Sequence, residues 1–200
     1  MAEPQLVYDI EDRRYVNIGR HCTLRCRFCP KTQGSLQVHQ YDLTLARQPT
    51  AAAIINSLGD LSGIQEVVFC GFSEPTLRMA VLLEVAQTVK ARGIPVRVNT
   101  DGLGNLANKR NILPELATCV DALSVSMNAQ NEEVYNRHCD PQLPGSYQAM
   151  LAFLAEAPHY IPQVTATAIQ GLEGVDIAAC KEQARKIGVA FRTRYLDQVG

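Results

Sequence analysis

Three cysteines within eight residues are the feature of this sequence with the clearest chemical meaning. Cys22, Cys26 and Cys29 are separated by three and two residues, and Pro30 follows the last of them. A short loop with these gaps can wrap three thiolates around one cubane iron–sulfur cluster, and no fourth cysteine follows nearby. The spacing therefore predicts a [4Fe-4S] cluster in which one iron is left open for chemistry.

Other kinds of cysteine site compete with an open cluster. A structural zinc site needs four closed ligands and would have to recruit a distant histidine or Cys70. A plain electron-carrier cluster would need a fourth thiolate in register, which the sequence does not offer. The remaining cysteines share no common spacing: Cys119 and Cys180 fall in apolar patterns typical of a core, while Cys70 and Cys139 have no assigned role.

The cysteine run, with the aromatic Phe28 just before its last member, resembles the signature of the radical S-adenosylmethionine (radical SAM) enzymes. The resemblance implies that S-adenosylmethionine binds the open iron and is cleaved by an electron from the cluster to give a 5′-deoxyadenosyl radical. The protein then supplies binding, orientation and exclusion of side reactions. An external one-electron reductant, of the flavodoxin or ferredoxin kind, is also implied. Such cleavage needs a cluster whose reduction potential lies at the low end of the range for iron–sulfur clusters, which begins at about −700 mV.

Composition limits the class of protein that carries this loop. The 200 residues suit one domain over 1–200 with a single core. Lysine and arginine number 19 against 20 acidic residues, so the net charge of −1 offers no basic field for nucleic acid or anionic lipid. No apolar run is long enough to span a bilayer, and seven cysteines, an odd number, suit a reducing compartment. We expect a cytoplasmic protein without a nucleic-acid or membrane partner.

Strand and helix patterns alternate along the chain, which is typical of an α/β protein. Short β-branched runs predict parallel strands at 15–19, 66–70, 95–100, 121–126, 163–169 and 189–195. Apolar residues at helical spacing predict helices at 51–58, 79–89, 147–154 and 177–187. Six such units indicate an incomplete (β/α)6 TIM-like barrel with a curved parallel sheet, since a closed barrel takes about 250 residues. Ligands of such folds bind at the carboxyl ends of the strands.

A candidate binding loop follows the second predicted strand. It consists of Gly71, Phe72, Ser73, Glu74 and Pro75. The run resembles the Gly-Gly-Glu-Pro segment that holds the amino group of S-adenosylmethionine in radical SAM enzymes. Its Glu-Pro pair matches, whereas Phe72 and Ser73 stand where the paired glycines usually are. Without the resemblance the same run would be an ordinary strand-to-helix turn.

Polar residues also close the next strands. Asn99 begins an Asn-Thr-Asp-Gly run, which on its own is typical of a turn. The resemblance implies that this run lies beside the methionine or ribose part of the ligand. Ser126 and Asn128 carry a hydroxyl and an amide suited to ribose hydroxyls or the ligand carboxylate. Ile169 matches a family position that packs on adenine, although a buried strand isoleucine is the commoner role.

The last strand and the order of the segments indicate which group of radical SAM proteins the chain resembles. Arg192 and Arg194 could bind an anionic group at the carboxyl end of the last strand, or they could be solvated surface charges. Together with the cysteine loop, the runs at 99–106 and 191–195 resemble the small TatD-linked radical SAM proteins. That family name does not supply a substrate.

The resulting hypothesis is a radical SAM enzyme that removes a hydrogen atom from an unidentified substrate. A chain without extra cysteine-containing domains resembles activases that abstract hydrogen from a glycine of a partner protein. A small-molecule substrate is equally compatible with the sequence. The alternative from a different class is a non-catalytic iron–sulfur or zinc-binding module. No general acid or base can be assigned from these residues.

Overall fold

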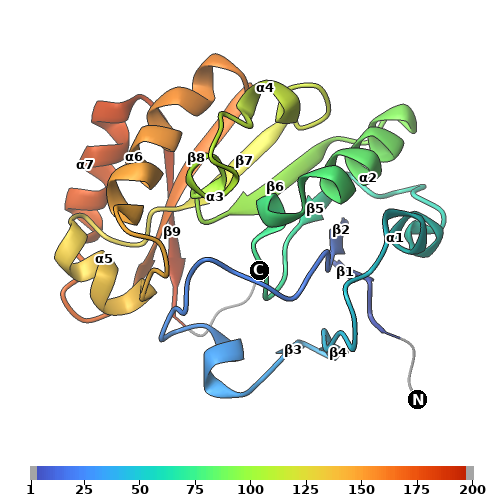
Figure 1. Ribbon diagram of the computed structural model, residues 1–200, viewed down its shortest axis with the longest axis horizontal. Coiled ribbons are helices and arrows are strands. Elements are labelled where there is room, and N and C mark those ends of the chain that lie inside the picture. The colour runs from blue at the N-terminus through green and yellow to red at the C-terminus, as the bar shows by residue number, and fades with distance from the viewer. Residues whose placement is uncertain (1–3, 197–200) are drawn as a thin grey trace.

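A computed structural model describes residues 4–196, and a seven-stranded sheet forms their centre (Figure 1). The strands are ordered β1-β2-β5-β6-β7-β8-β9, and all neighbours are parallel except β1 and β2. They are β1 Val7–Ile10, β2 Arg13–Val16, β5 Glu66–Phe69, β6 Val96–Thr100, β7 Ala122–Ser126, β8 Gln163–Gln170 and β9 Ala190–Tyr195. A separate hairpin pairs β3 (Gln37–Val38) with β4 (Tyr41–Asp42).

The parallel strands confirm the predicted fold class, an incomplete (β/α)6 TIM-like barrel with a curved sheet. The first strand is shifted from its predicted place: β2 begins at Arg13 rather than at residue 15, because Arg13 already pairs with Ile10 of β1 and Glu66 of β5. β1 and the β3–β4 hairpin are additions to the predicted set. The two-residue strands of the hairpin are too short to show an alternation of apolar and polar residues, and β1 lacks the β-branched run that marks β5.

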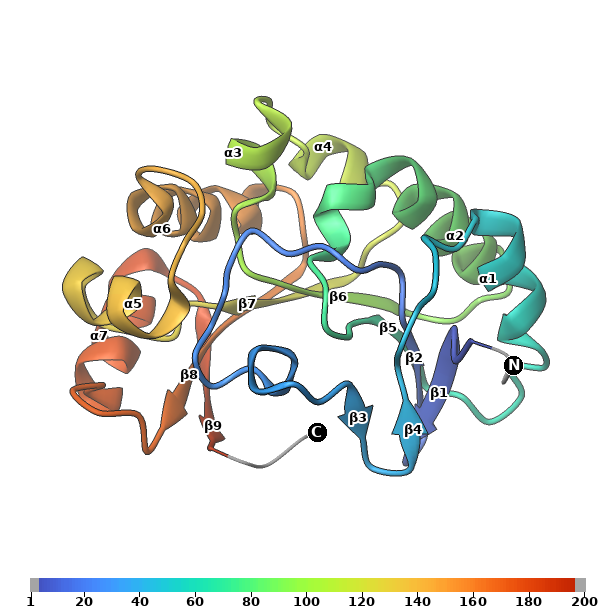
Figure 2. The same ribbon diagram turned by 60° about the horizontal axis from the view of Figure 1, so that its bottom comes forward.

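Helices cover one face of the sheet, and the segment that carries the cysteines crosses the other (Figure 2). The α-helices are α1 Ala51–Leu58, α2 Met79–Ala91, α3 Gly104–Asn108, α4 Leu113–Leu116, α5 Glu132–Cys139, α6 Ser146–Glu156 and α7 Ile177–Ile187. Three 3-10 turns are η1 Pro30–Gln33, η2 Pro75–Arg78 and η3 Ala157–His159. The four predicted helices are α1, α2, α6 and α7, and the Asp176 side chain caps α7 by accepting from Ala179 N at 3.0 Å. Among the described helices, none has the length and apolar character to cross a bilayer.

The alternation of side chains along the strands separates the core from the open face. Val67, Val96, Val98 and Val125 are fully buried in the main hydrophobic core, which they form together with the covering helices. The residues between them, such as Arg97, lie on the helix-free face. The sheet thus has one apolar face for stability and one polar face that can serve a ligand.

The turn after β6 depends on a glycine. Gly102 has a φ of +78°, and a Cβ there would lie 2.8 Å from Val125 Cγ1 and 3.1 Å from Met150 Cγ. We expect Gly102→Ala to lower the free energy of unfolding by about 2–4 kcal/mol in urea denaturation, because backbone strain and overpacking add. Gly188→Ala is the matched control, since Gly188 has a φ of +92° but no atom within 4 Å of such a Cβ. Equal losses in the two variants would show that packing around Gly102 contributes nothing.

Candidate active site

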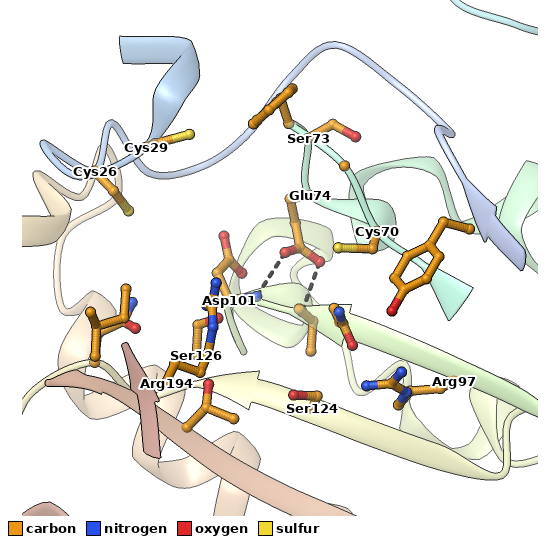
Figure 3. A pocket seen from close by; sticks show the side chains of 18 of the residues that line it. Cys26, Cys29, Cys70, Ser73, Glu74, Arg97, Asp101, Ser124, Ser126 and Arg194 are labelled. Carbon is orange, nitrogen blue, oxygen red and sulfur yellow. Dashed lines mark hydrogen bonds between the residues drawn. The ribbon is translucent and has the colours of Figure 1, made fainter. Parts of the chain in front are cut away.

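A cavity of about 600 Å³ lies between the polar face of the sheet and the cysteine segment (Figure 3). Its volume falls in the range of ligand sites, roughly 300–1,000 Å³. Every site residue expected from the sequence lines it except Pro75, which is buried at the start of η2. The expected residues that do line it are Cys22, Cys26, Cys29, Gly71, Phe72, Ser73, Glu74, Asn99, Ser126, Asn128 and Ile169.

The backbone of the cysteine loop is held by the end of α5. Arg25 N donates to Cys139 O at 3.0 Å, and Arg27 N donates to His138 O at 2.8 Å. Gln142 N in turn donates to Thr23 O at 2.9 Å. The loop is therefore fixed by contacts with residues more than 100 positions later in the chain, at the mouth of the cavity.

The thiol groups of Cys22 and Cys26 are held in their neutral form by their surroundings. Desolvation of the Cys22 sulfur, together with the carboxyl groups of Asp101 and Glu74, raises the pKa of Cys22 to about 12 although part of the residue is exposed. A hydrogen bond with Cys139 is the main cause that raises the pKa of Cys26. A metal reverses this preference because a coordinating thiol loses its proton.

The three thiols of the loop are donors of the kind that hold an iron–sulfur cluster. Among the described residues, no group of three or more histidines, cysteines or acids is arranged to hold one metal ion. A structural zinc would need four such ligands around one point. A cubane makes a different demand, because each thiolate binds its own iron and the sulfurs surround the cluster. Three thiols on one loop beside an open cavity meet that demand.

Unpaired polar atoms mark the ligand side of the cavity. Within the described residues, the buried Ser73 Oγ, Asn99 Oδ1 and Asn128 Oδ1 have no hydrogen-bond partner. Buried polar atoms are nearly always paired, so such exceptions at a cavity wall fit a bound polar ligand. Asn128 also has a φ of +61°, a strained conformation for a residue other than glycine. All three residues were expected near the ligand from the sequence, Ser73 as part of the loop after β5, and the structure places them around one cavity.

Glu74 has a second task that its sequence context did not reveal. The carboxylate is buried, and its Oε1 accepts from Thr76 N at 3.0 Å, Thr76 Oγ1 at 2.6 Å and Thr100 Oγ1 at 2.7 Å. Its Oε2 accepts from Asp101 N at 2.8 Å and keeps capacity for one more donor. Glu74 N donates to His21 O at 2.8 Å. Glu74 thus joins η2, the end of β6 and the cysteine segment.

Asp101 is the site residue that sequence reasoning missed. It is buried, its Oδ1 accepts from Leu103 N at 2.9 Å, and its Oδ2 accepts from the Thr23 hydroxyl and lies 4.0 Å from Cys22 Sγ. Complete burial and the neighbouring Glu74 carboxylate raise the pKa of Asp101 well above its ordinary value. Its place at the carboxyl end of a parallel strand is the signal that points to it.

The other cysteines are also placed by the structure. Cys119 and Cys180 are buried in the main core, as expected. Cys70 lines the cavity at the end of β5. Cys139 is fully buried on α5, where its sulfur accepts from Asn128 Nδ2 at 3.4 Å. Cys139 therefore links the cysteine loop to the polar wall.

Residues 16–186 match the family model described as the Radical SAM superfamily. The chain belongs to this superfamily. No curated protein matches it in sequence. The radical SAM match covers the cysteine loop and the strands β5 to β8, includes only the last residue of β2, and does not separate the TatD-linked group from other members.

Solved structures share the fold of this radical SAM protein. TYW1 with a lysine-pyruvate adduct has a TM-score of 0.65 at 15% identity, over 94% of this chain and 66% of TYW1. Streptococcus suis SuiB bound to S-adenosylmethionine has a TM-score of 0.64 at 13% identity, over 90% of this chain and 39% of SuiB. Kitasatospora setae TsrM with cobalamin and a [4Fe-4S] cluster has a TM-score of 0.60 at 12% identity, over 88% of this chain and 35% of TsrM. The chain thus spans about two thirds or less of these proteins. Of the two cofactors expected for this chain, SuiB is seen with S-adenosylmethionine and TsrM with a [4Fe-4S] cluster.

Proposed function

We propose that residues 1–200 form one radical SAM domain in which Cys22, Cys26 and Cys29 hold a [4Fe-4S] cluster beside bound S-adenosylmethionine. When bound, these two groups supply a 5′-deoxyadenosyl radical that removes a hydrogen atom from a substrate. The observation that carries the proposal is the three-cysteine loop at the mouth of a cavity whose wall carries unpaired polar atoms. The radical SAM match over 16–186 supports it.

The chain's own residues have distinct tasks in this proposal. Ser73, Asn99 and Asn128 orient the polar parts of S-adenosylmethionine through atoms that lack a partner among residues 4–196. Ser126 adds a hydroxyl to the same wall, and Ile169, which is 4% exposed, offers an apolar surface for adenine. The backbone of the Gly71, Phe72 and Pro75 segment shapes the end of the cavity that receives the amino group.

Gly71 illustrates how closely that segment approaches its neighbours. A Cβ at Gly71 would lie 3.2 Å from Asn17 Oδ1, and the residue has a φ of +154°, at the edge of the range that favours glycine. Glycine at this place keeps the segment against β2, which leaves its other side to the ligand.

The proposal includes partners outside the chain. An external one-electron reductant of the flavodoxin or ferredoxin kind must deliver the electron, since cluster potentials at the low end are needed. A cytoplasmic location is consistent with reduced thiols. The substrate is a small molecule or a segment of a partner protein; SuiB, one of the similar structures, is known with a precursor peptide bound.

The test is release of 5′-deoxyadenosine by reconstituted protein. Protein loaded anaerobically with iron and sulfide is mixed with S-adenosylmethionine and dithionite, and the products are separated chromatographically. We expect slow release without any substrate, which a zinc module or a plain electron carrier would not give. Cluster-replete protein that releases none would contradict the enzyme assignment.

Asn128 tests the ligand wall. We expect Asn128→Gly to retain its iron but to bind S-adenosylmethionine about ten- to a hundredfold more weakly, because a hydrogen bond to a charged group contributes roughly 1.5–3 kcal/mol. Glycine accepts the positive φ of this position, so strain does not confuse the result. Isothermal titration calorimetry measures the affinity, and Asn136→Ala on the exposed side of α5 is the control. An unchanged affinity would remove Asn128 from the site.

A further inference from the structure

Four arginines line the cavity in addition to the residues assigned above. Arg13 lies on β2, Arg97 on β6, and Arg192 and Arg194 on β9. Arg97 alternates with Val96 and Val98, which face the core, so its side chain is directed to the helix-free face. Figure 3 shows Arg97 and Arg194 reaching into the cavity from two sides.

Four arginines and three acids, Glu66, Glu74 and Asp101, line the cavity. Glu66 Oε2 pairs with Arg97 Nε at 2.9 Å and with Arg13 Nε at 3.5 Å, and Arg13 also pairs with Asp12 and Glu11 outside the cavity lining. Among residues 4–196, Arg192 and Arg194 have no ion pair and no side-chain hydrogen bond. The remaining cavity acids, Glu74 and Asp101, are occupied by the hydrogen bonds described above.

The guanidinium groups are close enough to influence one another. Arg192 is exposed by surface area, but desolvation of its guanidinium group first, and then the charges of Arg97 and Arg194, lower its pKa. Arg13 acts in the same direction from the other edge of the sheet. Only 15% of the Arg97 side chain is exposed. Like charges gathered in a partly enclosed space are unfavourable without a counter-ion, so the arrangement is suited to an anion.

We propose that Arg97 and Arg192, flanked by Arg13 and Arg194, bind a carboxylate or phosphate group of the substrate. This inference rests on the proposed radical SAM function and names the substrate class of the same cavity. The planar guanidinium group pairs with either anion through two parallel hydrogen bonds, which both fixes and orients it. Hydroxyl groups of Tyr15, Ser124 and Thr165 line the cavity beside the arginines.

Arg97 lies furthest from the expected place of S-adenosylmethionine, whereas Arg192 and Arg194 are in register with Thr167 and Ile169 of β8. Arg97 precedes Asn99 by two residues on the same face of β6, which places it about 7 Å further from the carboxyl end of the strand. The cysteines and the unpaired polar atoms lie toward that end. A substrate whose anion is held by Arg97, with Arg192 reaching it from β9, therefore extends toward the place where the radical is formed.

The experiment measures binding of succinate and inorganic phosphate to cluster-loaded protein by calorimetry at constant ionic strength. We expect one of them to bind, with S-adenosylmethionine present as well as absent. Arg192→Gln and Arg97→Gln should weaken this binding at least tenfold while leaving the affinity for S-adenosylmethionine unchanged. Arg185→Gln, which removes an exposed arginine from α7, is the matched control and should change neither affinity. Preference for one probe tells a carboxylate substrate from a phosphate one.

Several outcomes would overturn the inference. Absence of binding by both probes, or equal binding in Arg192→Gln, would show that the arginines are not an anion site. A matching fall in affinity for S-adenosylmethionine, or loss of anion binding once it is present, would mean that the arginines hold its carboxylate instead. Release of 5′-deoxyadenosine is scored separately: protein that binds the anion but releases none contradicts the proposed function and not the anion site.

Discussion

Alanine at any one of Cys22, Cys26 or Cys29 is expected to remove most of the iron from anaerobically reconstituted protein. The wild-type chain should hold about four iron and four sulfide ions, because three thiolates of one loop bind three corners of a cubane. With one thiolate lost, two ligands remain on a loop that has no replacement among its neighbours in sequence. Iron and sulfide analysis, together with the visible absorption of the brown protein, measures the effect.

The buried cysteines provide matched controls. Cys119→Ala and Cys180→Ala remove thiols from the core, so they should lower stability by a few kcal/mol at most and retain the cluster. Cys139→Ala is the closest control, since Cys139 contacts Cys26 but lies on α5 rather than in the loop. Loss of half the iron in any of the three would indicate a fourth ligand or a second cluster. Zinc filling the wild-type site after reconstitution with iron would contradict the cluster itself.

Glu74→Ala is expected to have the largest effect on stability among the site variants. The substitution leaves the Thr76 amide and hydroxyl, the Thr100 hydroxyl and the Asp101 amide without their common acceptor in a buried place. Each unsatisfied buried donor costs about 1–3 kcal/mol, so we expect a loss of roughly 3–5 kcal/mol with partial relaxation. Urea denaturation measures this loss. Affinity for S-adenosylmethionine should fall at least tenfold as the loop after β5 loosens.

Glu74→Gln separates the two tasks of this residue. Glutamine retains one acceptor oxygen at nearly the same place, so most of the stability should return while the negative charge is absent. If affinity for S-adenosylmethionine also returns, Glu74 acts by holding the loop alone. If affinity stays low in the stable variant, the carboxylate contacts the ligand directly. Glu84→Ala on the exposed face of α2 is the control, and a loss of stability there similar to that of Glu74→Ala would contradict the hydrogen-bond explanation.

Local sequence patterns were sufficient for most of the fold. The strands β5 to β9 and the helices α1, α2, α6 and α7 each carry enough residues to show their period, and Asp176 and Gly188 mark the ends of α7 by cap chemistry alone. The short helices α3, α4 and α5 were not predicted. The four and five residues of α4 and α3 make little more than one turn, and the eight residues of α5 are mostly polar, so packing rather than an apolar pattern decides them.

The sequence by itself determined the three-cysteine loop, the order of the β/α units and the polar strand ends, because spacing and period are properties of neighbouring residues. Only the tertiary structure decided how those segments meet. The Asp101 contact with Thr23, the Cys139 contact with Cys26 and the four donors gathered by Glu74 join residues of different strands and loops. So does the cluster of arginines around Arg192, which depends on the order of strands in the sheet. Side chains far apart in the chain become neighbours through sheet order and curvature, which no local pattern encodes.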